Sequence, residues 1–424
     1  MKNKVLLWLC MMFACVAMVA QSTSDLLPLP QQVKTSGGTF VMGKVVLETP
    51  VLQSEWMDFV QNGGGEVVEK SSKKIVVKLL PEIAEAKQNQ DEAYRMKVST
   101  KGVQIEATTE TGVYWALQTL RQLAVKKAVG SQIKNCRIVD WPAFQMRGFM
   151  QDVGRSYISM DELKREIDML SRYKINIFHW HLTENQAWRL ESKIFPMLND
   201  SVNMTRLKGK YYTIQEATEL VKFCQEHNVP LIPEIDMPGH SQYFDRTFGF
   251  SMASPEGMEV LEACLNEFMN EIPKEDCPYI HIGSDEVYIA DPEGFMKFCE
   301  GTVKAGGRTP LAWFPGLPSS EGTISQIWSD AGRKAAGENF PGPYIDSYMG
   351  YLNLGHPLIN TANFYLHQLC STEGCDGNAL GGILCLWNDA RVDDKTRIFP
   401  HNGMPEGLLG FAQGSWGGGK GHGW

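Results

Sequence analysis

Two adjacent acids stand at the end of an apolar stretch, in the sequence "YIHIGSDEVYI" of residues 279–289. Asp285 and Glu286 repel each other when both are ionised, and neither is expected to be fully buried without a partner. A solvated corner between a strand and a loop is the ordinary explanation for such a pair. A catalytic site is the alternative, because glycoside hydrolysis uses carboxyl groups to protonate the leaving oxygen and to stabilise a cationic centre.

Polar and aromatic residues also follow other short apolar stretches of the chain. The polar ones are Asp152, Arg155, His179, His181, Glu184, Glu234, Asp236 and His240. Three tryptophans, Trp313, Trp328 and Trp387, occupy matching places in later stretches. Tryptophan faces suit the apolar faces of sugar rings, and together with Tyr351 they can form the walls of a sugar-sized pocket.

The elements that must position these residues are short strands after about residue 141. The eight candidates are "FQMRGFMQDV", "INIFHWHLT", "VPLIPEID", "YIHIGSDEV", "TPLAWFP", "ISQIWSD", "PYIDSYM" and "GGILCLWND". Amphipathic helices separate the first of them, for example at 160–173 and 213–227. Near-continuous apolar strands that alternate with helices predict a parallel sheet. Eight of them in roughly 250 residues predict a (β/α)8 TIM barrel, an α/β fold whose active site lies where the strands end.

The barrel is expected over residues 141–424, with less regular crossovers in its second half and a last helix that is either complete or partial. Residues 21–140 contain strand-like pieces, such as "KIVVKLL" and "GVQIEA", and the helical piece "GVYWALQTLRQLAV". They predict a smaller N-terminal α+β domain. Residues 1–20 combine two lysines with the apolar run "VLLWLCMMFACVAMVA", which is typical of a secretory signal peptide. We therefore expect a periplasmic or extracellular protein, with a retained membrane anchor as the alternative.

Composition excludes some classes of protein. The 424 residues are 43% hydrophobic and carry a formal net charge of −9, without a run of Lys or Arg, so nucleic acid is not an expected partner. The ten cysteines include no Cys-x-x-Cys pair, so a structural zinc site is not expected. Cys370 and Cys375 can close a short loop or remain free thiols.

The chain resembles the family-20 glycoside hydrolases, the β-N-acetylhexosaminidases. The matching stretches are "RGFMQDVGRSY", "YKINIFHWHLTENQAWRLE", "PEIDMPGHS", "YIHIGSDEV" and "GGILCLWND", which occur in the order of the family. The resemblance implies an exo-acting, retaining enzyme that removes a terminal β-linked N-acetylhexosamine from a glycan. It implies no cofactor and no metal. The 2-acetamido group of the substrate is the nucleophile, an exception to the scheme with two catalytic carboxylates.

The resemblance also implies roles for individual residues. Glu286 is the general acid/base, and Asp285 orients the acetamido group. Arg155 and Asp389 bind sugar hydroxyls, and His240 with Glu184 supports the acid. The remaining substrate-binding residues implied are Trp313, Trp328, Tyr351 and Trp387.

Departures from the family pattern concern the hydroxyl-binding end of the pocket. Glu184 stands where the family usually has Asp, and Asp389 where it usually has Glu. Ser156 replaces a frequent His, "GSDE" replaces "GGDE", and Asn353 replaces a common Asp. These changes leave open the choice among GlcNAc, GalNAc and 6-sulfated forms of the sugar.

Two other classes of protein stay open from the sequence. His179 and His181 are two residues apart on a strand and therefore face the same side, so a metal-dependent hydrolase can be built with Glu184 and His240. The other alternative is a carbohydrate-binding homologue that has lost catalysis, although the retained pair of acids argues against it.

Overall fold

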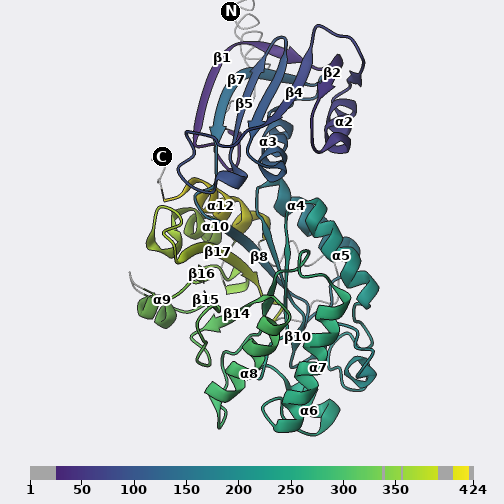
Figure 1. Ribbon diagram of the computed structural model, residues 1–424, viewed down its shortest axis with the longest axis vertical. Helices are drawn as coiled ribbons and strands as arrows, with labels where there is room; N and C mark the ends of the chain where they lie inside the picture. Colours follow the sequence, from purple (N-terminus) through teal and green to yellow (C-terminus); the bar gives the residue numbers. More distant parts are fainter. Residues whose placement is uncertain (1–24, 337–339, 355–356, 390–403, 420–424) are drawn as a thin grey trace, which may run out of the picture. The chain divides into compact units, whose positions relative to one another are not determined.

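The computed structural model describes residues 25–336, 340–354, 357–389 and 404–419 (Figure 1). It divides into two compact units, one up to Trp141 and one from Pro142. The expected signal peptide, residues 1–20, lies outside the described residues. No helix in the described part of the chain is both long and apolar enough to cross a membrane.

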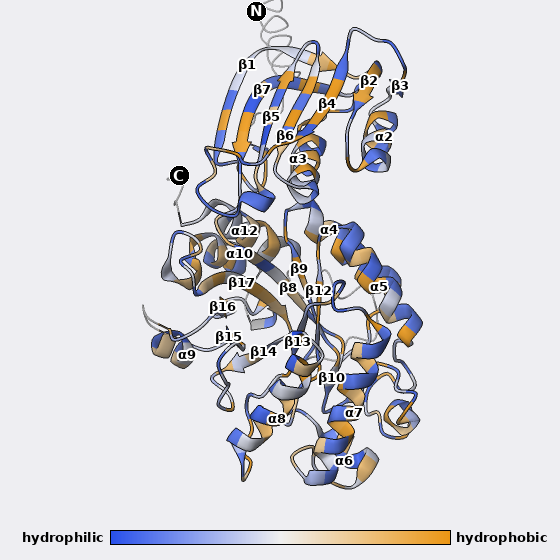
Figure 2. Ribbon diagram, viewed as in Figure 1, coloured by the Kyte–Doolittle hydropathy of each residue, from blue (hydrophilic) through white to orange (hydrophobic). Residues whose placement is uncertain are grey.

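The N-terminal unit is a seven-stranded sheet with the strand order β1-β7-β5-β6-β4-β2-β3. Its strands are β1 (Gln32–Val41), β2 (Lys44–Glu48), β3 (Glu66–Val67), β4 (Lys74–Leu79), β5 (Tyr94–Ser99), β6 (Gly102–Ala107) and β7 (Gln132–Asp140). Its helices are α2 (Gln53–Asn62), η2 (Gln90–Glu92) and α3 (Glu110–Leu123). Figure 2 shows hydrophilic and hydrophobic residues alternating along β5 and β7, as expected for strands with one buried face. The predicted α+β domain is confirmed.

The second unit is a closed barrel of eight strands in which every neighbouring pair is parallel. The strands are β8 (Met146–Asp152), β9 (Ile177–His181), β12 (Leu231–Glu234), β13 (Tyr279–His281), β14 (Thr309–Phe314), β15 (Ile324–Ile327), β16 (Tyr344–Asp346) and β17 (Ala379–Leu386). Each overlaps one of the eight predicted stretches, so the predicted (β/α)8 barrel is confirmed.

Helices cover the outside of the barrel unevenly. The α-helices are α4 (Met160–Arg172), α5 (Ile214–Glu226), α6 (Gln242–Phe248), α7 (Pro255–Glu271), α8 (Pro292–Ala305), α9 (Asp330–Ala336), α10 (Pro357–Leu366) and α12 (Met404–Gly417). The connections also contain β10 (Thr183–Glu184), β11 (Ala187–Trp188), η3 (Pro196–Asn199), η4 (Leu352–Leu354) and η5 (Leu369–Ser371). No helix lies between β14 and β15, where all nine connecting residues, 315–323, are described. The second half of the barrel is therefore the less regular one.

The interior of the barrel is filled by side chains from alternating strand positions. Its apolar part comprises Met146, Met150, Ile177, Ile232, Leu311, Trp313, Ile324, Ile345, Ile383 and Cys385. The eight cysteines of the described residues form no disulfide bond, and Cys370 and Cys375 are among them. The barrel thus depends on packing and not on disulfide bonds.

Candidate active site

A cavity of about 170 Å³ opens where the barrel strands end. It is lined by Arg155, Asp236, His240, Asp285, Glu286, Trp328, Tyr351, Asn353, Trp387 and Asp389. These residues follow β8, β12, β13, β15, β16 and β17. The polar and aromatic residues that the sequence placed at six different strand ends are therefore brought to one site, as the barrel geometry requires.

The two adjacent acids both reach this cavity because the chain leaves the extended conformation after β13. Successive side chains of a strand point in opposite directions. Here Ser284 has a φ of 91° and Glu286 a φ of 50°, so the backbone turns at this point. Asp285 is buried, with 9% exposure, whereas the Glu286 side chain is 56% exposed. The same cavity therefore receives one enclosed and one accessible carboxyl group.

Gly283 permits the close approach of a third acid. A Cβ atom at Gly283 would lie 1.8 Å from Oδ1 of Asp236, and the φ of 67° also favours glycine. Asp236 is buried, and its Oδ1 accepts a hydrogen bond from the backbone N–H of Ser284 at 3.4 Å. Burial, followed by the nearby Asp285, raises the pKa of Asp236 well above its usual range.

Asp285 also holds its proton more tightly than an ordinary aspartate. Burial raises its pKa to about 7, with Glu234 and Glu286 acting in the same direction and His240 acting against them. Perturbed carboxyl groups in a pocket are frequent at functional sites. The charge of Asp285 therefore changes near neutral pH.

His240 contacts both the accessible acid Glu286 and the buried acid Glu184. Its Nε2 lies 3.3 Å from Oε2 of Glu286, and its Nδ1 lies 2.5 Å from Oε1 of Glu184. Burial alone would lower the pKa of His240, but Glu184, Asp236 and Asp285 raise it to about 10. His240 is therefore an imidazolium at neutral pH, and it contacts Glu286 with a positive charge.

Arg155 is held in place by three carboxylates. Its guanidinium nitrogens lie 2.8 Å from Glu184, 3.1 Å from Asp152 and 3.5 Å from Asp389. The guanidinium also lies over the Trp387 ring, 5.0 Å from its centroid. These acids raise the pKa of Arg155 although burial acts in the opposite direction. The cavity therefore has a fixed positive donor beside an aromatic wall.

Two of the predicted substrate-binding residues lie beneath the cavity. Trp313 is 2% exposed, and its indole N–H donates to Oε1 of Glu234 at 2.7 Å. Glu184 is fully buried behind Arg155 and His240. Neither belongs to the described lining residues. Among the three predicted tryptophan walls, only Trp328 and Trp387 line the cavity, together with Tyr351.

The histidines of the barrel interior surround Glu234. His179 Nε2 and His181 Nδ1 lie 2.8 and 2.7 Å from its Oε2, and His281 Nδ1 lies 3.3 Å from its Oε1. Burial lowers the pKa of His179 to about 4, whereas Glu234 outweighs burial and raises that of His181 to about 9.

The metal-binding set considered from the sequence is not assembled. Glu184 contacts His240, and none of the groups of described residues whose ligand atoms lie close together contains Glu184. Groups whose ligand atoms lie within 4.8 Å are instead His179–Glu234–His281, His181–Glu234–Asp236 and Asp236–His240–Asp285. In the first two groups Glu234 is already engaged by ring nitrogens and by the Trp313 indole, which fits a polar network that supports the cavity floor.

Sequence reasoning missed three features of the site. Asn353 donates through Nδ2 to Oδ2 of Asp389 at 2.6 Å, so two of the departures from the family pattern form one pair. Asp152 accepts from the backbone N–H of Asn388 at 3.1 Å. Asp236 stands at a strand end in the sequence, but that position alone assigns it no role in the site. In the sequence, most of these residues are recognisable only as polar residues that follow a strand. That position does not show which other residue each of them contacts.

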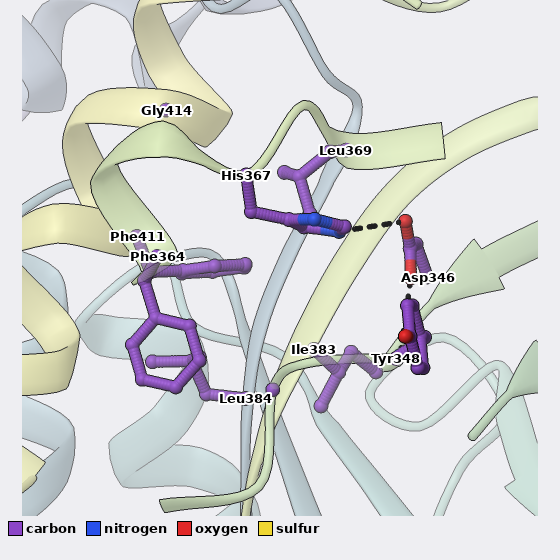
Figure 3. Close-up of a pocket in the computed structure, with 10 residues that line it drawn as sticks. Asp346, Tyr348, Phe364, His367, Leu369, Ile383, Leu384, Phe411 and Gly414 are labelled. Atoms are coloured by element: carbon purple, nitrogen blue, oxygen red, sulfur yellow. Dashed lines mark hydrogen bonds and ion pairs between the residues drawn. The ribbon is translucent and has the colours of Figure 1, made fainter. Parts of the chain in front are cut away.

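A second cavity, of about 10 Å³, lies between β16, β17, α10 and α12. Figure 3 shows His367 pointing toward Asp346, with Phe364, Leu384 and Phe411 at its apolar side. A volume of this size accommodates about one water molecule. The cavity of about 170 Å³, which contains the acids and the aromatic rings, is therefore the candidate for substrate.

A closed parallel barrel with acids and aromatic rings at its mouth has the architecture of the TIM-barrel enzymes. Residues 144–248 match the catalytic domain of glycosyl hydrolase family 20, and residues 23–141 match domain 2 of the same family. The chain therefore belongs to glycosyl hydrolase family 20.

Curated relatives match over parts of their length. A beta-hexosaminidase from Porphyromonas gingivalis is 29% identical over 325 aligned positions, and the match covers 61% of this chain and 42% of that protein. Beta-hexosaminidase 1 from Arabidopsis thaliana is 31% identical over 362 aligned positions, and the match covers 70% of this chain and 64% of that protein. The chain spans about half the length of several bacterial relatives: 42%, 53% and 57%.

Solved structures share the fold over nearly the whole chain. An exo beta-N-acetylglucosaminidase from Vibrio harveyi, in complex with N-acetylglucosamine, has a TM-score of 0.80 at 23% identity; the match covers 95% of this chain and 75% of that one. A beta-N-acetylhexosaminidase from Bacteroides fragilis has a TM-score of 0.78 at 22% identity, covering 94% and 92%.

Proposed function

We propose that this protein is an exo-acting, retaining β-N-acetylhexosaminidase that uses the substrate's 2-acetamido group as nucleophile. The observation that carries the proposal is the pair of adjacent acids on one cavity: Asp285 is enclosed, and Glu286 is accessible and contacts His240. Support also comes from the family match and from relatives that are named beta-hexosaminidases. The substrate class is a glycan with a terminal β-linked GlcNAc or GalNAc, and no cofactor is required.

The proposed reaction divides the work between the two acids. Glu286 donates a proton to the glycosidic oxygen while the acetamido carbonyl oxygen of the substrate attacks C1. The C1–oxygen bond breaks and a cyclic oxazolinium forms, which water opens from the opposite face as Glu286 takes a proton back. Two inversions give net retention at C1. Asp285 accepts a hydrogen bond from the acetamido N–H and stabilises the positive charge that develops there.

The other residues are assigned to the sugar or to its support. Trp328, Trp387 and Tyr351 enclose the ring and its acetamido group. Arg155, Asp389 and the neighbouring Asn353 bind the hydroxyls. Glu184 acts on the sugar only through Arg155 and His240, because it lies behind both. Trp313 supports the cavity floor through Glu234.

The first experiment removes the nucleophile from the substrate. Nitrophenyl β-glycosides of GlcNAc, GalNAc, 6-sulfo-GlcNAc and glucose are assayed side by side. The glucoside, which has a hydroxyl in place of the acetamido group, should be hydrolysed many orders of magnitude more slowly, because a positioned internal nucleophile has an effective concentration of about 10⁵ M or more. A comparable rate with the glucoside, or a sugar trapped covalently on Asp285 or Glu286, refutes the mechanism.

The same panel addresses the preference among sugars. Asp389 and Asn353 form a hydrogen-bonded pair at the hydroxyl end, and their chemistry differs from the more common residues of the family. The values of kcat/KM for the three N-acetylated glycosides decide among GlcNAc, GalNAc and the 6-sulfated sugar. Chelator-resistant turnover would exclude the metal-dependent alternative, and any turnover of the N-acetylglucosaminide would exclude an inactive carbohydrate-binding homologue.

We propose further that the protein is exported and acts in the periplasm or outside the cell. The proposal rests on the two lysines and the apolar run within residues 1–20. N-terminal sequencing of the protein from its native host should find the new terminus close to residue 21. Recovery of the intact N-terminus in the membrane fraction would instead support an anchor.

A further inference from the structure

The connection between β9 and α5, residues 182–213, is unusually long for a barrel loop. Its segment "NMTRLKGK", residues 203–210, contains three basic side chains and follows η3. We refer to this segment as the basic segment.

A buried arginine fixes the backbone of the basic segment. Arg189 is fully buried and donates to the carbonyl oxygens of Arg206 at 2.9 Å, Leu207 at 3.1 Å and Lys210 at 2.7 Å. Its Nε donates to the carbonyl of Val153 at 3.2 Å, directly after β8. One side chain thus ties the segment to the end of a barrel strand.

A second arginine fixes the start of the same segment. Arg246, from α6, donates to the carbonyl of Asn203 at 2.9 and 3.1 Å and to the carbonyl of Asn185 at 2.7 Å. Asn185 follows Glu184, the residue behind Arg155 and His240. The backbone of the basic segment is therefore held at both ends by buried or neighbouring arginine side chains.

The side chain of Arg206 reaches from the basic segment to the backbone that follows β17. Its Nη1 donates to the carbonyl of Asn388 at 3.0 Å and its Nη2 to the carbonyl of Asp389 at 2.9 Å. These residues are 182 and 183 positions away in the sequence. They directly follow Trp387, and we refer to residues 387–389 as the wall segment.

The wall segment carries two lining residues of the cavity, Trp387 and Asp389. The Asp389 side chain is 59% exposed, and its carboxylate contacts only Arg155 and Asn353 in the described part of the chain. Because few neighbours restrain the exposed side chain of Asp389, its orientation depends on the position of its backbone. On one side Asp152 accepts from the N–H of Asn388, and on the other Arg206 donates to the two carbonyls.

We propose that Arg206 is a positioning residue that fixes the wall segment, and with it the sugar-binding orientation of Trp387 and Asp389. Arg206 is not among the described residues that line the cavity, so it acts through the wall and not on the sugar. The two parallel donors of a guanidinium suit two successive carbonyls better than a single ammonium does. The role in sugar binding rests on the proposed function, whereas the fixing of the wall does not.

The first test measures the wall without any substrate. Hydrogen exchange of the full-length protein is followed for the peptide that contains residues 384–389, in the wild type, Arg206→Ala, Arg206→Lys and Lys208→Ala. Lys208 is exposed in the same segment and serves as the matched control. Arg206→Ala should exchange about tenfold faster at 387–389, because local opening sets the exchange rate. Arg206→Lys should be intermediate, and Lys208→Ala should equal the wild type.

The second test measures the consequence for the sugar. With a nitrophenyl N-acetylglucosaminide, Arg206→Ala should raise KM about tenfold with a much smaller change in kcat, which corresponds to about 1.4 kcal/mol of binding. In an Asp389→Ala background the same substitution should have a clearly smaller effect on KM, because part of the wall has already been lost.

Each outcome bears on the proposal separately from the proposed function. Unchanged exchange at 387–389 in Arg206→Ala overturns the proposal, and so does faster exchange with an unchanged KM. Equal KM effects in the wild-type and Asp389→Ala backgrounds overturn it as well, since they indicate a general loss of structure. If the wild type hydrolyses no N-acetylhexosaminide, the proposed function fails while the exchange experiment still tests the fixing of the wall.

Discussion

Asp285 and Glu286 are adjacent in sequence, yet one is enclosed among carboxyl groups and the other faces the open side of the cavity next to His240. The difference in surroundings arises from a backbone turn at Ser284 and Glu286, which a strand pattern does not reveal. Substitution of each acid should therefore have a different kinetic signature, although both changes replace a carboxyl group by an amide.

Glu286→Gln should slow the hydrolysis of substrates with poor leaving groups by about 10²–10⁴-fold, the usual contribution of general acid catalysis. A nitrophenyl leaving group needs little protonation, so the rate of hydrolysis of a nitrophenyl glycoside should fall much less. Asp285→Asn is the matched comparison and should reduce both rates alike, because Asp285 acts on the acetamido group. Measurement of kcat/KM for an alkyl and a nitrophenyl glycoside decides the assignment, and parallel losses in Glu286→Gln would contradict it.

The acid limb of the kcat/KM profile should report Asp285. Its pKa is raised to about 7 by burial, so protonation at lower pH removes the acceptor for the acetamido N–H. We expect kcat/KM to fall about tenfold per pH unit below 7.

Two substitutions should move this limb in opposite directions. His240 lowers the pKa of Asp285, so His240→Asn should shift the limb to higher pH. Glu286 raises it, so Glu286→Gln should shift the limb to lower pH. Profiles for the three proteins with a nitrophenyl substrate check the signs, and an unshifted limb in both variants would assign it to another group.

At the scale of elements, the sequence predicted all eight barrel strands because their apolar runs are short and bounded by turn residues. Helices α4 and α5 were predicted from their amphipathic spacing, and α4 indeed buries Leu163, Ile167 and Leu170 on one face. The strand β1 was not predicted. Its first seven residues are all exposed, so the sequence shows no alternation of apolar and polar residues there.

The candidate site was predictable to the extent that its residues follow strands directly. Trp313 was expected at the wall because it ends a strand like Trp328, but its side chain lies inward on Glu234. The contact of Arg206 with the wall segment joins a side chain to backbone carbonyls more than 180 residues away, so no residue type at either end signals it. Side-chain direction and backbone contacts of this kind require the fold.

The irregular second half of the barrel depends on one buried acid. Asp346, at the end of β16, accepts from Arg333 of α9 at 2.5 Å and from the N–H of Cys370 in η5 at 2.8 Å, and it lies 3.1 Å from Nε2 of His367 (Figure 3). Asp346 therefore joins α9, β16 and η5 where the crossovers are short.

Asp346→Asn should destabilise the protein by about 3 kcal/mol, because it leaves Arg333 without its buried counter-charge. Thermal unfolding should show a melting temperature lowered by several degrees. Asp330→Asn is the control: it removes an exposed carboxylate of α9 that contacts Lys334, and it should leave the melting temperature unchanged. Equal effects of the two substitutions would contradict the assignment of Asp346 as the organising residue.

Across the whole molecule, several buried groups bind protons more tightly in the folded state than in the unfolded chain. Burial, with Glu162 in support, raises the pKa of Glu166 well above 4.5, and the pKa of Asp285 is raised to about 7. Two histidines also bind protons more tightly: the pKa of His181 is raised from 6.5 to about 9, and that of His240 from 6.5 to about 10. Glu166 lies on α4, so its effect on stability should add to the effects of the site residues, whereas Asp285 and His240 change each other's pKa values and their effects should not simply add up.

The direction of the pH dependence follows from this proton binding. A group with a raised folded-state pKa contributes stability that is fully present below its unfolded pKa and is lost as the pH rises through its folded pKa. The acids therefore lose stability above pH 4 to 4.5, and the histidines lose it between pH 6.5 and 10. Glu234 and His179, whose pKa values are lowered, act in the opposite sense and lose stability as the pH falls.

We therefore expect the folded protein to be most stable in mildly acidic solution and to lose stability steadily from pH 6 to pH 9. Each extra bound proton costs about 1.4 kcal/mol per pH unit within its window. Melting temperatures measured at pH 5, 6, 7, 8 and 9 should decline above pH 6. A melting temperature that rises from pH 6 to pH 9 would show that the groups with lowered pKa values dominate.

Glu166 offers a test of one group within this balance. Glu166→Gln keeps the size of the side chain but removes its titration, so its melting temperature should match the wild type near pH 4.5 and exceed it increasingly toward pH 9. Glu219→Gln, which changes an exposed acid of α5, provides the control and should follow the wild type at every pH. A Glu166→Gln variant that is less stable than the wild type at pH 9 would contradict this expectation. It would show that Glu166 is ionised in the folded state and that its carboxylate stabilises the protein.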